Sequence, residues 1–364
     1  MGNLNDYIEW RGDLRFSDVG LCEVDALILS IISYMRFDGV VPGVDEDSSV
    51  TLLEAVKRLL GKNKGKKVTI GKLFPPEFIA LTVAAAKSRR FSGIRLMCYE
   101  NEISEVEEKQ FSALTFKITR DKYFVAFRGT DDTLTGWKES FNMSFMLPIP
   151  AQREAAEYFS KVAKKYNGSF YLGGHSKGGN LAVYAAAEAE DSAKDRIITI
   201  YNNDGPGFDR EYVNGEKFRS VQDKILTVVP QSSVVGMLLE HEEEYVIVKS
   251  NAGGLLQHDG STWEVTGGSF VHLDTVTEDS KLIDRRLKEW LDGMPPSGRE
   301  KFVDTVFETL TATNAKTLTE LTSDKLKLVK AWSSLDQTTK NFLLKFAAIL
   351  IKHNALSVKK KKSK

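Results

Sequence analysis

The stretch that decides the fold reads Tyr171-Leu172-Gly173-Gly174-His175-Ser176-Lys177-Gly178-Gly179-Asn180. Within it, Gly-x-Ser-x-Gly is the pattern of a nucleophile elbow, a sharp turn from a strand into a helix with a serine at its apex. Ser176 must adopt a strained conformation there, and the strand and helix then pass very close to each other. A Cβ two residues before or after the serine would clash, so glycine is expected at 174 and 178.

The residues on both sides agree with such a turn. Residues 168–172, Gly-Ser-Phe-Tyr-Leu, are typical of a short buried strand, and residues 181–190 are strong helix formers without Gly or Pro. Strand, turn and helix is the order that the elbow requires. We therefore predict a nucleophilic serine at 176; the alternative is an ordinary glycine-rich turn.

Alternating helical and apolar segments predict the rest of the fold. Helices are expected at 24–36, 50–60, 76–90 and 151–166, and further strands at 94–99, 114–118, 123–127, 197–201, 225–229 and 245–248. This order predicts an α/β class fold, a mixed sheet that is mostly parallel in its centre with helices on both faces. Functional residues of such sheets collect at the carboxyl ends of the strands.

The chain changes character near residue 292. We assign residues 1–292 to the α/β domain with its N-terminal helices, 293–298 to a linker, 299–358 to a helical C-terminal region and 359–364 to a basic tail. An apolar stripe precedes the tail at Phe342, Leu343, Phe346, Ile349 and Leu350. The stripe and tail resemble a membrane-surface helix with a polybasic end. We favour a stripe packed on the body and solvated lysines.

Composition and charge exclude several classes of protein. The chain has 42% hydrophobic and 27% charged residues, as ordinary globular proteins do, and its formal net charge is zero. Residues 340–364 carry eight lysines and no acid, so residues 1–339 carry −8. This argues against nucleic acid as a partner of the body and leaves an anionic membrane as a peripheral partner of the tail.

The cysteines and the absence of long apolar runs suggest a compartment. Cys22 and Cys98 are too few for a disulfide framework and have no metal-ligand spacing to a histidine, so we expect no metal or cofactor. The first 20 residues lack the apolar core of a secretory signal, and no apolar run reaches the ~20 residues of a bilayer span. We expect a cytoplasmic protein, with membrane-peripheral location as the alternative.

A serine nucleophile needs a histidine base and an acid. His258 follows the last predicted strand and lies after Ser176 in the chain, which fits the Ser…acid…His order; His272 is the second choice. His175 should point away from its neighbour Ser176, and His353 lies in the C-terminal part of the chain. Because His241 stands among glutamates, a solvated charged loop is the simpler interpretation there.

The acid is less obvious, because the loop after the strand at 225–229 has no carboxylate. Asp204 ends the preceding strand and is followed by Gly205 and Gly207, which suit a tight turn, so we choose it to orient the imidazole. A turn-stabilising aspartate is the alternative. Asp259 adjoins His258 and is badly placed to bond its ring, and Asp223 is less well placed than Asp204.

Two backbone amides should stabilise the oxyanion of the tetrahedral intermediate. One is the N–H of Lys177, directly after the nucleophile, and the other comes from an earlier strand-end loop. Thr130 is the natural choice for the second donor, because it follows the buried strand at 123–127.

These motifs resemble two related families. Phe127-Arg128-Gly129-Thr130 with Gly174-His175-Ser176-x-Gly178-Gly179 is similar to the class 3, fungal-type lipases, which implies an oxyanion donor at Thr130, the nucleophile at Ser176 and the histidine at His258, shortly before Trp263.

The closer resemblance is to the Mbeg-like family of bacterial α/β-hydrolases, over roughly residues 5–290. It is carried by Asp25-Ala26-Leu27, Phe127 to Asp132, Gly136 to Glu139, Gly174 to Asn180, Asn203 to Phe208 and Gln257-His258-Asp259. It implies an α/β-hydrolase fold but no substrate.

The chain departs from the class 3 lipase pattern at two positions. Lys177 replaces the usual leucine, and a cation there would favour anionic substrates, although only its backbone N–H is needed. The usual acid position, 57 residues past the serine, falls on Ser233, which makes Asp204 a substitute.

The sequence therefore predicts a serine hydrolase of the lipase or esterase type that cleaves a lipid or other acyl ester through an acyl-enzyme on Ser176. Residues 131–150 would form a lid, an acyl-contact surface or simply a packed helix. The alternative function is an inactive hydrolase-fold scaffold that binds partners through its C-terminal helices.

Overall fold

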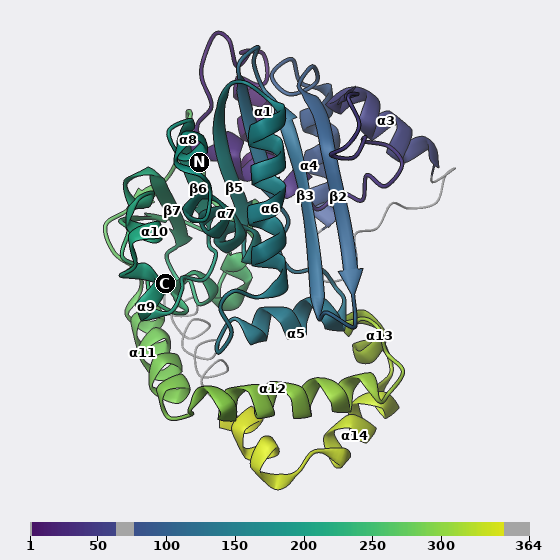
Figure 1. The fold of residues 1–364 in the computed structure, drawn as a ribbon, viewed down its shortest axis with the longest axis vertical. Coiled ribbons are helices and arrows are strands. Elements are labelled where there is room, and N and C mark those ends of the chain that lie inside the picture. Colours follow the sequence, from purple (N-terminus) through teal and green to yellow (C-terminus); the bar gives the residue numbers. More distant parts are fainter. Residues whose placement is uncertain (1, 63–75, 346–364) are drawn as a thin grey trace.

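The computed structural model describes residues 2–62 and 76–345, which build a mixed sheet of nine strands in the order β1-β2-β3-β4-β5-β6-β7-β8-β11 (Figure 1). The strands are β1 (Val50–Thr51), β2 (Arg95–Ser104), β3 (Lys109–Lys117), β4 (Lys122–Phe127), β5 (Ser169–His175), β6 (Ile197–Asn203), β7 (Ile225–Pro230), β8 (Tyr245–Val248) and β11 (His272–Leu273). Strands β4 to β8 are parallel, and β1 to β3 and β11 pair antiparallel with their neighbours. The predicted mixed sheet with a parallel centre is confirmed.

Helices cover both faces of the sheet, as predicted. One face packs against α1 (Leu4–Arg11), α2 (Glu23–Ile32), α3 (Leu52–Lys62) and α4 (Pro76–Lys87), and the other against α6 (Pro150–Lys165) and α7 (Lys177–Ala187). Four more helices connect successive strands of the sheet along the chain: α5 (Leu134–Asn142), α8 (Asp191–Lys194), α9 (Arg210–Val213) and α10 (Glu216–Arg219). Strands β9 (Val265–Thr266) and β10 (Ser269–Phe270) form a separate hairpin. The chain continues with α11 (Glu278–Asp292), α12 (Pro296–Thr311), α13 (Leu318–Ser323) and α14 (Lys325–Ser334).

Strand β4 shows why a continuous apolar run becomes a central strand. Phe124 and Ala126 lie in the core beneath α2 and α4, whereas Val125 and Phe127 lie in the core beneath α6 and α7; all four are 0% exposed. Successive side chains of a strand point to opposite faces, so a strand buried on both faces needs apolar residues throughout. Each large apolar side chain buried in this way stabilises the fold by roughly 1.5–3 kcal/mol.

A buried ion pair fastens the N-terminal helices to this body. Arg90 and Asp25 contact each other at 2.5 Å with fully buried side chains, and Tyr7 donates a hydrogen bond to the same carboxylate at 2.7 Å. The guanidinium also donates to three backbone carbonyls between residues 14 and 20. Because the charge is paired and saturated with hydrogen bonds, it can stay inside.

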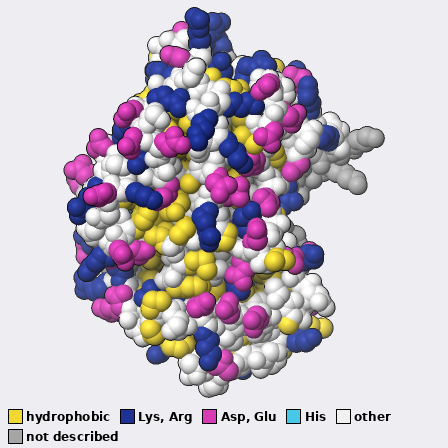
Figure 2. Space-filling view, viewed as in Figure 1, with side chains coloured by type: hydrophobic (Ala, Val, Ile, Leu, Met, Phe, Trp, Pro, Cys, Tyr) yellow, Lys and Arg dark blue, Asp and Glu magenta, His cyan; other side chains and the backbone are white. Residues whose placement is uncertain are grey.

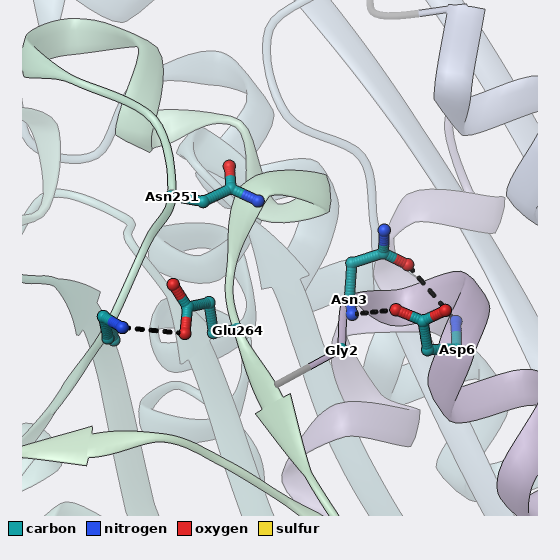
Figure 3. Close-up of a pocket in the computed structure, with 6 residues that line it drawn as sticks. Gly2, Asn3, Asp6, Asn251 and Glu264 are labelled. Carbon is teal, nitrogen blue, oxygen red and sulfur yellow. Dashed lines mark hydrogen bonds and ion pairs between the residues drawn. The ribbon is translucent and has the colours of Figure 1, made fainter.

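A polar hollow of about 440 Å³ lies on this side of the molecule and is lined by Gly2, Asn3, Asp6, Lys249, Asn251 and Glu264 (Figure 3). Several of its polar groups pair with one another. Asp6 accepts from the backbone N–H of Asn3 at 2.7 Å, and Lys249 contacts Glu264 at 3.0 Å. None of the residues predicted for catalysis lines it.

The C-terminal helices extend from the edge of the sheet and run beyond the carboxyl ends of its parallel strands (Figure 1). There α12 packs on α5, with Phe141 and Phe307 at 5.8 Å between ring centres and Lys138 paired to Asp304 at 2.7 Å. The helix α12 begins at Pro296, inside the stretch expected as a linker. Breaks around residues 312–317 and at 324 divide the expected helical region into α12, α13 and α14.

The apolar stripe predicted before the tail is described only in part. The ring of Phe342 packs against Trp290 and Phe302, at 6.5 and 5.9 Å between centres, so this member of the stripe packs on α11 and α12. Phe346, Ile349 and Leu350, together with His353 and the basic tail, lie outside the described residues. Among the helices of residues 2–62 and 76–345, none has the length and apolar character needed to cross a membrane.

Candidate active site

The turn predicted at residues 171–180 is present, and Ser176 stands at its apex with φ 58° and ψ −134°. Strand β5 ends at His175, and α7 begins at Lys177. A Cβ on Gly174 would lie 2.2 Å from the carbonyl carbon of Gly178, and one on Gly178 would lie 2.1 Å from the carbonyl oxygen of Phe127. Both glycines are therefore required by the close approach of strand and helix. Such strained backbone is typical of functional sites.

His258 and Asp204 form a hydrogen-bonded pair at the carboxyl end of the sheet. His258 Nδ1 lies 2.6 Å from Asp204 Oδ2, with the carboxylate buried and the imidazole side chain 30% exposed. An ionised carboxylate only accepts, so the assigned tautomer carries its proton on Nδ1. Nε2 then keeps the lone pair that a general base needs.

Ser233, the residue onto which the sequence resemblance places the acid position, contacts Asp204. Its hydroxyl donates to Asp204 Oδ1 at 2.5 Å, and the backbone N–H of Gly236 donates to the same oxygen at 3.2 Å. Asp204 itself has φ 52°, which aspartate and asparagine tolerate better than most residues. The loop after β7 thus holds a carboxylate that comes from the loop after β6. The hydrogen bond from Ser233 to Asp204 was not predicted from the sequence.

Ser176, Asp204 and His258 are neighbours in space although 82 residues separate the first from the last. The backbone N–H of Ser176 donates to the carbonyl of Asn203 at 2.9 Å, directly before Asp204. On the other side, the His258 ring lies 4.7 Å from the ring of His175. Within the described part of the chain, no hydrogen bond joins the Ser176 hydroxyl to His258.

The His175 side chain contacts Tyr34 and His258, two partners that the sequence did not reveal. Its Nε2 lies 2.7 Å from the backbone carbonyl of His258, and its Nδ1 lies 3.2 Å from the hydroxyl of Tyr34. With Nε2–H donated to the carbonyl, Nδ1 accepts from the tyrosine. Burial, and secondarily the nearby His258, lowers the pKa of His175 to about 3. A neutral His175 thus anchors the backbone of His258.

This lowered pKa predicts acid sensitivity. An unfolded histidine titrates near pH 6.5, so between about pH 6.5 and 3 the unfolded chain binds a proton at 175 that the folded chain does not. The stability contributed by the neutral ring is complete above that range and falls by about 1.4 kcal/mol per pH unit within it. In His175→Gln, whose amide can donate to the same carbonyl, we expect a shallower acid slope in denaturant unfolding from pH 7 to 4. Equal slopes in the two proteins would contradict the assignment.

The two predicted oxyanion donors flank the elbow. The loop that holds Thr130 passes close to Ser176, since a Cβ on Gly129 would lie 3.3 Å from Ser176 Cβ. Thr130 Oγ1 contacts Ser140 Oγ at 2.6 Å, which fastens this loop to α5. Within residues 2–62 and 76–345, the backbone N–H groups of Thr130 and Lys177 have no hydrogen-bond acceptor. Both are therefore available to a substrate oxygen.

The expectation that Lys177 places a cation near the site is wrong. Its Nζ lies 2.6 Å from Glu139 Oε2 and 2.8 Å from the carbonyl of Gln110, and both charged side chains are at most 1% exposed. The positive charge is neutralised beneath α5 and cannot select anionic substrates. The contact between Lys177 and Glu139 also anchors α5. Residues 134–142, within the predicted segment 131–150, therefore form a helix packed on the body.

The other histidines and acids considered from sequence have different partners from the His258–Asp204 pair. His272 contacts Glu23 at 2.9 Å. The interpretation of His241 as solvated is wrong, because its side chain is 10% exposed and its Nδ1 contacts Glu243 at 2.9 Å. Asp259 accepts from the backbone N–H of Ser261, and its pKa is raised by burial. Asp223 is exposed in a short 3₁₀ helix.

A strained serine at a strand-to-helix elbow on a mixed, centrally parallel sheet defines an α/β-hydrolase type of fold. The chain belongs to the Mbeg1-like family, whose model matches residues 85–308. The resemblance to this family expected from the sequence is confirmed.

Solved structures of lipases are among those similar to the chain. A Rhizomucor miehei lipase in complex with its propeptide is 14% identical, with a TM-score of 0.34 over 43% of this chain and 57% of that one. M37 lipase is 15% identical, with a TM-score of 0.37 over 60% of this chain and 69% of that one. The chain thus spans 57% of the Rhizomucor lipase, and these likenesses are too distant to inform on activity. No curated protein is detectably similar to the chain.

Proposed function

We propose that the protein is a serine hydrolase of the lipase or esterase type, with Ser176 as nucleophile, His258 as base and Asp204 as the acid. The observation that carries this proposal is the 2.6 Å hydrogen bond between His258 and the buried carboxylate of Asp204, beside a serine held at φ 58°. Each feature costs free energy unless something offsets it: a buried carboxylate must be paired, and a positive φ is strained. Acyl transfer requires a paired histidine and carboxylate close to an exposed serine, and both features lie at the carboxyl end of the sheet.

The proposed reaction proceeds in two halves. In the first, His258 Nε2 takes the proton of Ser176 as Oγ attacks the ester carbonyl, Asp204 stabilises the imidazolium, and the proton passes to the leaving alcohol. In the second, His258 deprotonates a water molecule that attacks the acyl-enzyme; the bond from the acyl carbon to Ser176 Oγ breaks, the imidazolium returns the proton to Oγ, and the carboxylic acid product leaves. The N–H groups of Thr130 and Lys177 stabilise both oxyanions, and loss of one such donor typically costs roughly 3–4 kcal/mol.

An apolar surface supports an acyl group in the substrate. Apolar side chains gather over the segment that joins α5 to α6 (Figure 2). This segment includes Met143, Phe145, Met146, Leu147 and Pro148, all half-buried. It follows α5, so it lies towards the carboxyl ends of the parallel strands (Figure 1). A lipid or other acyl ester therefore fits this end of the molecule better than a charged substrate does.

The missing Ser176–His258 hydrogen bond favours a second function, an inactive scaffold on a hydrolase fold. Catalytic hydrogen bonds are often long or unformed without substrate, so this observation weighs less than the formed His258–Asp204 pair. A scaffold also has no need for a strained serine.

Covalent labelling separates the two functions. A fluorophosphonate probe reacts with an activated serine, so we expect wild-type protein to be labelled at Ser176 and to hydrolyse p-nitrophenyl butyrate. Ser176→Ala should lose both, and Ser192→Ala, at an exposed position on α8, should lose neither. Labelling that persists in Ser176→Ala, or wild-type protein that is neither labelled nor active, would reject the enzyme.

A further inference from the structure

Helix α14 presents an apolar face to solvent at the far end of the C-terminal region. Leu326 is 81% exposed, Val329 66% and Trp332 43%. These residues follow one another at spacings of three, so they lie on one side of the helix. Another side of the helix packs inward: Ala331 is 4% exposed, and α14 contacts α12 and α13. The face is thus held out by the fold and is not a frayed end.

Positive charge predominates near this face. Lys325 and Lys330 are exposed on the same helix, and residues 324–345 contain five lysines and two acids, Asp324 at the N-cap of α14 and Asp336. Tryptophan and aliphatic side chains flanked by lysine are what a helix needs to lie in the boundary between lipid headgroups and acyl chains. The lysine stems add apolar length while their ammonium groups reach the headgroups.

The position of α14 agrees with contact to a flat surface. It lies beneath α12 on the side away from the sheet, beyond the carboxyl ends of the parallel strands (Figure 1). Ser176, Asp204 and His258 are at that same end.

We propose that α14 is a membrane-docking helix whose apolar face, Leu326, Val329 and Trp332, enters the interface of an anionic bilayer while Lys325 and Lys330 contact lipid phosphates. A second copy of the chain is a poorer occupant, because a twofold contact would bring the lysines of both copies together. This surface is independent of the reaction proposed above, since vesicle binding requires no ester hydrolysis.

Vesicle co-sedimentation tests the proposal with full-length protein. We expect binding to equimolar phosphatidylcholine and phosphatidylglycerol, weak binding to phosphatidylcholine alone, and at least tenfold weaker binding of Leu326→Glu/Val329→Glu, because two large apolar side chains no longer enter the lipid. Ile103→Glu/Val106→Glu is the matched control: it changes the end of β2 and the turn that follows it, where these side chains are 42% and 95% exposed, and should bind like wild type. All variants keep the C-terminal lysines, so the tail alone cannot explain a difference.

Trp332 reports its own environment. The difference between the emission spectra of wild-type protein and Trp332→Phe should shift to the blue on addition of the mixed vesicles, and brominated lipid should quench it. Equal vesicle binding by both double variants, or an unshifted Trp332 spectrum, would overturn the proposal. So would a dimer in light scattering that Leu326→Glu/Val329→Glu dissociates, because the face would then belong to a second copy.

Discussion

Asp204→Asn should lower kcat for ester hydrolysis by roughly 10⁴-fold, the loss typical when a triad acid becomes an amide. The amide presents an N–H to His258 Nδ1, which then accepts and leaves the proton on Nε2, where it blocks the base. The fold should survive, because asparagine tolerates the φ of 52° and keeps an oxygen for Ser233. Steady-state kinetics and thermal unfolding measure the two effects separately.

A second variant tests whether a carboxylate at position 233 can replace that of Asp204. Its hydroxyl is 2.5 Å from one carboxylate oxygen of Asp204, whose other oxygen is 2.6 Å from His258. In Asp204→Gly/Ser233→Asp, glycine accepts the positive φ and vacates the space that the longer side chain at 233 can enter. We expect this double variant to recover at least tenfold in kcat over Asp204→Gly.

Ser233→Asp alone is the necessary contrast. It would place a second carboxylate against Asp204 in a buried site, where like charges cannot both ionise cheaply. We therefore expect it to be less stable than wild type and less active.

If Asp204→Asn hydrolyses esters as fast as wild type does, Asp204 has no part in the reaction and the triad proposed here is wrong.

Local patterns in the sequence predicted the scaffold well. The apolar run of β4 and the glycine spacing of the elbow each depend on neighbours within a few residues, so local sequence patterns predict the strand and the turn. The contact between Asp204 and His258 could also be predicted, because residues at the carboxyl ends of parallel strands meet at one edge of the sheet. The catalytic roles of the two residues remain predictions.

Contacts between side chains that are far apart in the chain could not be predicted from the sequence. Lys177 suggested an exposed cation because nothing near it in sequence is acidic, whereas its partners Gln110 and Glu139 are 67 and 38 residues away. The contacts of His175 with Tyr34 and His258 span 141 and 83 residues. Such pairs depend on how strands and helices assemble, which a single sequence does not encode locally.

Glu139→Gln should cost about 3–5 kcal/mol of folding free energy, because it leaves the ammonium of Lys177 buried without a counter-charge. Both oxygens of the carboxylate already accept backbone hydrogen bonds, from Ala151 at 2.8 Å and Gln110 at 3.1 Å, so the amide also loses an acceptor. Lys177→Met should cost a similar amount by leaving Glu139 unpaired. Urea unfolding of both variants measures the losses.

The double variant Glu139→Gln/Lys177→Met should lose much less than the two single losses combined, since it removes both buried charges together. Glu188→Gln is the matched control, because Glu188 pairs with Lys217 at the same 2.6 Å but the lysine side chain is 63% exposed. Exposed pairs contribute at most about 1 kcal/mol. If Glu139→Gln and Glu188→Gln are equally mild, then water reaches Lys177 in solution, and the ammonium is not sequestered beneath α5.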